Sequence, residues 1–174
     1  MNGRSEVEQV HQDLVPLIES FSERQTEAKE AIKKLMVAER RIFCAAAIRV
    51  LAQTALSPGT RYLAQLLSNE RLLGPGLLDT VNCRTEEALG AARAAVEAGL
   101  PIQNGLEFAL KIALQEQPSF ANTAKILRAL DLLAASAPAG WWDGTQLEVM
   151  NYPDNKVRSR AALLIGRCSK STIC

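Results

Sequence analysis

Apolar side chains recur at intervals of three and four near the start of the chain, which is the spacing of one face of an α-helix. The stripe follows Ser5, a residue type that often caps helices, and consists of Val7, Val10, Leu14, Leu17, Ile18 and Phe21. We expect Pro16 to kink this helix or to mark its true first turn, because proline has no backbone N–H to donate. The stretch from Leu17 to Leu56 contains neither Gly nor Pro. It therefore predicts one long helix, or two helices with a tight joint between Ser22 and Thr26.

Residues 42–56 are apolar on nearly every side, which predicts a helix that neighbours cover on several sides. Cys44 lies in this run, and we interpret it as a small buried hydrophobic residue. The sequence Ser57-Pro58-Gly59 is expected to end the helix, and Thr60 to cap the next one. The run Leu72–Leu78, which contains Gly-Pro-Gly, predicts an apolar turn packed against the core.

Short helical patterns separated by Gly and Pro fill the second half of the chain. Thr85, with acidic residues at the next two positions, predicts a helix start, and Gly99 predicts its end. The remaining helices are expected at about residues 101–115, 118–136, 144–150 and 154–168. Helix starts at Thr85, Ser119 and Asp154 are about 35 residues apart, within the range of helical solenoids.

These patterns predict an all-α fold in a single domain that spans residues 1–174. Residues 1–57 are expected to form longer helices. Residues 58–174 are expected to form antiparallel helix pairs stacked as a short α-solenoid.

The segment Gln146–Arg167 carries a more specific pattern: an apolar helix end, a Pro-Asp turn, Val-Arg, paired alanines, a leucine pair and a glycine. This segment, about an eighth of the chain, resembles a HEAT repeat, and the chain from Thr85 onward looks like bacterial HEAT-like proteins of unassigned function. The resemblance implies a solenoid whose second helices line a concave, ligand-facing side. Tyr152 stands where the family often has Asp, so the chain departs from the family's Asp–Arg contacts between repeats.

The physical chemistry of this segment agrees with the resemblance. Asp154 is placed to accept hydrogen bonds from backbone N–H groups at the start of the last helix. The apolar stripe of that helix is expected to be Val157, Ala161, Leu164 and Cys168.

Composition narrows the range of functions. Apolar residues make up 48% of the chain, which excludes a disordered protein. Twenty Lys and Arg residues against nineteen Asp and Glu give a net charge of +1, which argues against a dedicated nucleic-acid binder.

No motif for catalysis, metal binding or cofactor binding stands out. The four cysteines form no Cys-x-x-Cys pair, and the single histidine, His11, has no nucleophile motif with it. The loop around Gly74-Pro75-Gly76 lacks the Lys-Ser/Thr that follows in a phosphate-binding loop. We therefore predict no catalytic, metal-binding or cofactor-binding residues. Without a secretory signal or a membrane-length apolar run, a cytoplasmic protein with no membrane contact is expected.

Basic residues gather on one arc of the last predicted helix. Lys156, Arg160 and Arg167 lie on that arc with the apolar Leu163 among them. The arc is either a solvated helix face or a contact strip for an acidic partner or a phosphate backbone. A solenoid normally ends in a polar cap, and the few residues after this helix are too short for one. We therefore expect Leu163 to pack against a second protein chain, which could be a copy of this one.

Trp141 and Trp142 lie in a glycine-bounded turn. One ring could plug a helix end, or the pair could anchor a partner, since Trp is common at binding hot spots. The function expected from the sequence is a non-catalytic protein-interaction scaffold. The alternative is a nucleic-acid-associated helical-repeat protein that uses the basic strip at the C-terminal end.

Overall fold

The computed structural model of the chain describes residues 3–100, 102–136 and 149–163. Within these ranges every regular element is an α-helix and no strand occurs, which confirms the all-α prediction. The chain folds as two compact units, residues 1–102 and 103–174. The prediction of a single domain stays a prediction.

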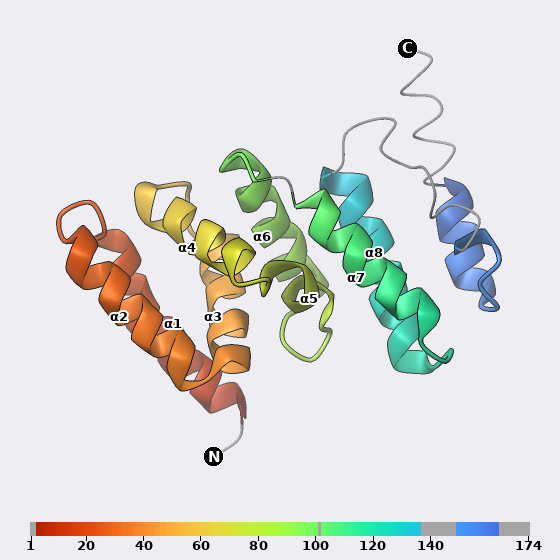
Figure 1. Cartoon of the computed structure of the whole chain (residues 1–174), viewed down its shortest axis with the longest axis horizontal. Helices are drawn as coiled ribbons and strands as arrows, with labels where there is room; N and C mark the ends of the chain where they lie inside the picture. The colour runs from red at the N-terminus through yellow and green to blue at the C-terminus, as the bar shows by residue number, and fades with distance from the viewer. Residues whose placement is uncertain (1–2, 101, 137–148, 164–174) are drawn as a thin grey trace, which may run out of the picture. The chain divides into compact units, whose positions relative to one another are not determined.

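The first unit contains α1 (Gly3–Glu19), α2 (Gln25–Ala38), α3 (Arg40–Gln53), α4 (Pro58–Asn69), α5 (Leu73–Leu78) and α6 (Thr85–Glu97) (Figure 1). Helix α3 packs against all five of the others. Its buried residues come from every side of the helix: Phe43, Cys44, Ala45, Ala46, Ala47, Ile48, Val50 and Leu51. The prediction of a central apolar helix is therefore confirmed, with Arg40 as its first residue.

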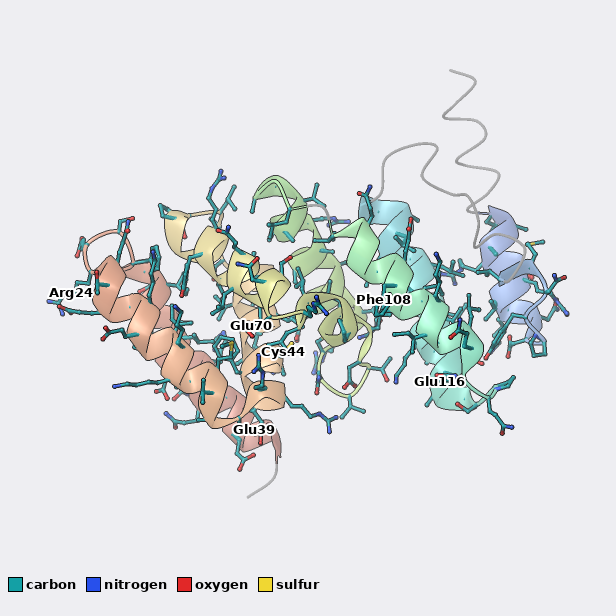
Figure 2. All side chains as sticks on the ribbon, in the orientation of Figure 1. Arg24, Glu39, Cys44, Glu70, Phe108 and Glu116 are labelled. Atoms are coloured by element: carbon teal, nitrogen blue, oxygen red, sulfur yellow. The ribbon has the colours of Figure 1, made fainter. Side chains whose placement is uncertain are left out.

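The stretch from Leu17 to Leu56 is broken twice. The first break, between α1 and α2, lies at the predicted joint. The second break, at Glu39, was not expected, because no Gly or Pro marks it. Glu39 has an extended backbone, and its carboxylate accepts a hydrogen bond of 3.2 Å from the N–H of Arg41 (Figure 2). This charged residue therefore ends α2 and caps α3.

Two details of α1 differ from expectation. The helix begins at Gly3, so Ser5 lies inside it and does not cap it. Pro16 does not mark its first turn but lies near its C-terminal end. The Pro16 carbonyl accepts a hydrogen bond of 3.0 Å from the N–H of Ser20.

Helices α1, α3 and α6 run in the same direction. Near the start of α3, the guanidinium of Arg41 lies 3.5 Å from the carboxylate of Asp79, which precedes α6. Near the end of α3, the Cβ of Ala52 would lie 3.1 Å from a Cβ placed on Gly90 of α6. At the end of α1, Ile18 contacts Gly59, which follows α3. Along the chain, α2 connects α1 to α3, and α4 follows α3 on the way to α6, so both return the chain to the end from which the next parallel helix begins.

The start of α4 is held by a reciprocal cap. The Ser57 hydroxyl accepts from the N–H of Thr60 at 3.2 Å, and the N–H of Ser57 donates to the Thr60 hydroxyl at 2.7 Å. The cap is therefore Ser57, not Thr60 as expected, with Pro58 at the first helical position. The run Leu72–Leu78 is packed against the core as predicted, since Leu73, Leu77 and Leu78 are buried. It is not a turn, however, because Leu73–Leu78 forms the short helix α5.

Helix α6 begins and ends where the sequence predicted. Thr85 is its first residue rather than its cap, because Arg84 occupies the cap position and its side chain makes no capping hydrogen bond. Gly99 follows its end with φ of +83°, a conformation that glycine adopts without steric cost. The N–H groups of Gly99 and Leu100 donate to the carbonyls of Val96 and Ala95, which closes the last turn.

The second unit contains α7 (Gln103–Gln115), α8 (Phe120–Ser136) and a helix over residues 155–163. Helices α7 and α8 pack side by side (Figure 1). The Ser119 hydroxyl accepts from the N–H of Asn122 at 3.1 Å, so the predicted helix start is confirmed. The Asn122 amide donates to the carbonyls of Ala113 and Gln117 at 3.0 and 3.3 Å, which caps the end of α7.

Apolar positions of the second unit divide between core and surface. In α8, Leu127 is half-buried, and the other large apolar residues of its middle turns are buried: Ile126, Leu130, Leu132 and Leu133. In α7, Leu106 and Leu110 are buried, whereas Ile112 is 44% exposed and Phe108, labelled in Figure 2, is 66% exposed.

The start of the helix over residues 155–163 agrees with the sequence prediction. Asp154 accepts from the N–H of Lys156 at 2.8 Å, and Val157 and Ala161 are fully buried. The stripe is therefore confirmed at these two positions. Its other members, Leu164 and Cys168, lie outside the described residues.

Candidate functional site

An open cleft of about 920 Å³ lies in the first unit, along one face of α3. Helix α3 contributes Ile42, Ala45, Arg49 and Gln53, which are spaced three or four residues apart and so lie on one face. Val7 and Glu8 of α1 line it as well, together with residues 80–84 before α6 and Glu87 in the first turn of α6. The parallel course of α1, α3 and α6 brings these segments together.

The α3 side of the cleft is apolar in its middle, between charged residues at its start and polar residues toward its end. Ile42 is half-buried and presents apolar surface to the cleft, and the buried Ala45 forms part of the cleft floor. One and two turns further on, Arg49 is half-buried and Gln53 is exposed. On the loop before α6, Val81 is 85% exposed. The cleft therefore offers apolar contacts beside hydrogen-bond donors, the usual composition of a ligand-binding site.

Some charged groups of the cleft already have partners within the fold. The Glu39 carboxylate accepts from the N–H of Arg41. The guanidinium of Arg41 lies 3.5 Å from the carboxylate of Asp79, which also accepts from the N–H of Val81 at 3.0 Å. These contacts hold the loop before α6 against the start of α3, so they shape this end of the cleft.

Arg49 differs from these groups. Among the described residues it takes part in no ion pair and no side-chain hydrogen bond, although it is half-buried. Glu87, also half-buried, forms no ion pair with it or with another described residue. A half-buried charge has lost part of its hydration, so an incoming group of opposite charge can replace that hydration.

Two cysteines lie at and beneath the wall of the cleft. Cys83 lines it, and Cys44 on α3 is buried, as predicted (Figure 2). Burial, reinforced by Cys83 and Asp79, raises the pKa of the Cys44 thiol to about 12. A Cβ on Gly76 would lie 2.5 Å from the Cys44 sulfur, so only glycine fits there. Cys44 is therefore a protonated packing residue, because nucleophilic attack requires the thiolate.

The basic strip predicted at the C-terminal end is only partly described. Lys156 and Leu163 are exposed, with Leu163 at 62%. Arg160 forms an ion pair with Asp131 of α8, so its charge is partly neutralised within the second unit. Arg167, Trp141 and Trp142 lie outside the described residues.

Sequence reasoning did not find the cleft, although one signal pointed to it. Arg49 is the one charged residue in the otherwise apolar run of residues 42–52. A charge inside a helix that is covered on most sides requires a local opening or a partner. No such signal predicts that Arg84 and Glu87 line the cleft, because charged residues are common both just before a helix and in its first turn.

Comparisons with known proteins do not assign the site. No protein-family model, curated protein or solved structure gives a significant match to this chain. Within the described residues, no group of three His, Cys, Asp or Glu side chains could hold a metal ion. None of the helices described is both long and apolar enough to cross a membrane.

Proposed function

We propose that this protein is a non-catalytic interaction scaffold that holds a segment of a partner protein in the cleft along α3. The observation that carries the proposal is an open cleft between three parallel helices, with apolar surface at Ile42 beside Arg49, which forms no ion pair with any residue that the structure describes. A partner segment can bury apolar side chains against Ile42 and place a polar group beside Arg49.

The length of the cleft suits a peptide. The α3 residues that line it run from Glu39 to Gln53, a rise of roughly 20 Å along the helix axis. An extended peptide of about six residues spans that distance. Compact ligands would contact only part of such a surface.

Catalysis is the less favoured assignment for this cleft. The Cys44 thiol beneath the wall has its pKa raised, the reverse of what activates a nucleophile. The Glu39 carboxylate is engaged as a helix cap. A binding function requires neither group to react.

The helix arrangement of the first unit supports a place among helical-repeat proteins. Parallel helices α1, α3 and α6, with α2 and α4 returning between them, form the kind of two-layered stack that solenoids repeat. This stacking is compatible with the short HEAT-like α-solenoid that we propose for residues 58–174 from the sequence pattern, and from the same pattern we propose a cytoplasmic location.

Selection of short random peptides displayed on phage tests the proposal. We expect enriched peptides whose binding weakens about fivefold or more in Thr80→Trp, because Thr80 is an exposed residue of the cleft wall and a Trp there narrows the cleft. The matched control is Thr26→Trp, at an exposed position on α2 that does not line the cleft. Failure to enrich any peptide, or equal binding by Thr80→Trp, would overturn the proposal.

The strip around Lys156 and Leu163 remains a second proposed contact, for a protein partner or a second copy of the chain. Its support is the exposure of Leu163 beside charged residues. Size-exclusion chromatography with light scattering tests it. A monomer unchanged by Leu163→Glu would remove the self-association proposal. The nucleic-acid alternative is less favoured, because Arg160 is already paired with Asp131.

A further inference from the structure

The charges along the cleft are unequally satisfied. Three arginines and three glutamates line it: Arg41, Arg49, Arg84, Glu8, Glu39 and Glu87. Of the acids, Glu39 caps α3, and Glu87 lies in the first turn of α6, where the helix dipole favours a negative charge. Glu8 is exposed near the start of α1. The acidic groups therefore have local stabilisation or full hydration.

Arg49 has neither. It lies in the interior of α3, away from the C-terminal turn where a helix dipole favours a positive charge, and it is half-buried. The neighbouring lining position on α3, one turn before it, is the apolar Ala45. The least satisfied charge in the cleft is therefore positive and lies one turn before Gln53, the last lining residue of α3.

We infer that the partner segment held in this cleft is acidic and that one of its carboxylates pairs with the guanidinium of Arg49. This inference rests on the proposed function and specifies its ligand. Pairing a carboxylate with a guanidinium can form two parallel hydrogen bonds, which are stronger than bonds between neutral groups. Arg84 on the opposite wall adds a second positive charge along the path of the segment.

The same geometry predicts an apolar residue next to that acid in the bound segment. Ile42 and Ala45 lie one to two turns before Arg49 on the same face of α3. A side chain placed there removes apolar surface from water, while the acid reaches Arg49. The cleft would therefore recognise a peptide in which an acidic residue, bound at Arg49, is followed or preceded by an apolar residue that lies nearer the start of α3.

For Glu87, the inference predicts the opposite effect on peptide affinity from that predicted for Arg49. This half-buried acid lies on the α6 side of the cleft, so an acidic peptide that follows the cleft meets a charge of its own sign there. Glu87→Gln should therefore strengthen the binding of an acidic peptide, whereas Arg49→Gln should weaken it. A peptide that binds through apolar contacts alone would respond to neither substitution.

Two phage-displayed peptide libraries test the inference, one with Asp and Glu as its only charged residues and the other with Lys and Arg. The wild-type chain should enrich peptides from the acidic library. For the best of them, Arg49→Gln should weaken binding about tenfold, and replacing the peptide's critical acid by its amide should cause a similar loss. In the combined variant the two losses should not add, because both remove the same pair.

The control is Arg93→Gln, which removes one positive charge at an exposed position of α6 outside the cleft. It should leave the affinity unchanged, and circular dichroism should show that every variant stays folded. Enriched peptides that depend on Thr80 but ignore Arg49→Gln, or that come from the basic library, would overturn this inference and leave the proposed function standing. Enrichment from neither library would remove both.

Discussion

The carbonyl oxygen of Ile18, in α1, lies against the face of Gly59 from which a side chain would project, in the first turn of α4. A Cβ placed on Gly59 would lie 2.5 Å from that oxygen, closer than any side-chain carbon can approach a backbone atom. The end of α1 and the start of α4 are therefore in direct backbone contact. This contact sets how closely α4 can approach the layer that contains the cleft.

Gly59→Ala should destabilise the first unit by about 1–3 kcal/mol, because the added methyl group forces two backbones apart. Gly105→Ala in α7 is the matched control, since no described atom lies within 4 Å of its Cβ position. There the same change should stabilise the protein by about 0.5 kcal/mol, through the helix preference of alanine. Urea unfolding followed by circular dichroism measures both, and effects of the same sign would contradict the packing argument.

Arg71 and Gly99 end α4 and α6 in the same left-handed conformation, with φ of 59° and 83°. Arg71→Gly should raise the free energy of unfolding by up to about 1 kcal/mol, because glycine adopts this conformation without steric cost. Gly99→Ala should lower it by about 1 kcal/mol, although nothing lies within 4 Å of the added methyl group. Chemical denaturation of both variants checks the pair. A destabilised Arg71→Gly would show that the arginine side chain contributes more than its backbone costs.

Asn122 is a buried polar residue that donates to two carbonyls at the end of α7. Asn122→Ala should lower the free energy of unfolding by about 1–3 kcal/mol, because it removes the donor for these buried groups. Asn155→Ala, at an exposed position in the same unit, should change it by less than about 0.5 kcal/mol. Equal effects of the two substitutions in urea unfolding would refute the capping role.

The buried Cys44 thiol predicts a loss of stability at high pH. Its pKa is raised from 9.0 to about 12, so the unfolded chain loses this proton first as the pH rises. The stabilisation is fully present below pH 9 and declines between pH 9 and about 12, by up to about 1.4 kcal/mol per pH unit.

Unfolding free energies measured from pH 8 to 10.5 should therefore fall more steeply for the wild type than for Cys44→Ala. The slopes are compared, because the substitution also leaves a cavity. A second readout is alkylation by iodoacetamide, which should be slow at Cys44 in the native protein and fast in urea. Parallel pH slopes together with rapid native alkylation would show that the thiol is accessible.

Several elements could be predicted from the amino-acid pattern because they depend on neighbours along the chain. The all-α class follows from the helical spacing of apolar residues, and the central position of α3 follows from apolar residues on all its sides. Gly99, Ser119 and Asp154 mark helix ends because their own side chains, or the lack of one, satisfy local backbone groups. Each of these interactions spans only a few residues.

The tertiary structure alone decided the break at Glu39, the short helix α5 and the cleft. A glutamate in a charged run does not reveal whether its carboxylate will cap the following helix. The sequence shows that Arg49 is charged but not that α1 and α6 leave its face of α3 uncovered. Periodicity reports which face of a helix seeks burial, whereas the neighbours that cover it come from segments many residues away, whose approach is set by packing contacts such as that between Gly59 and Ile18.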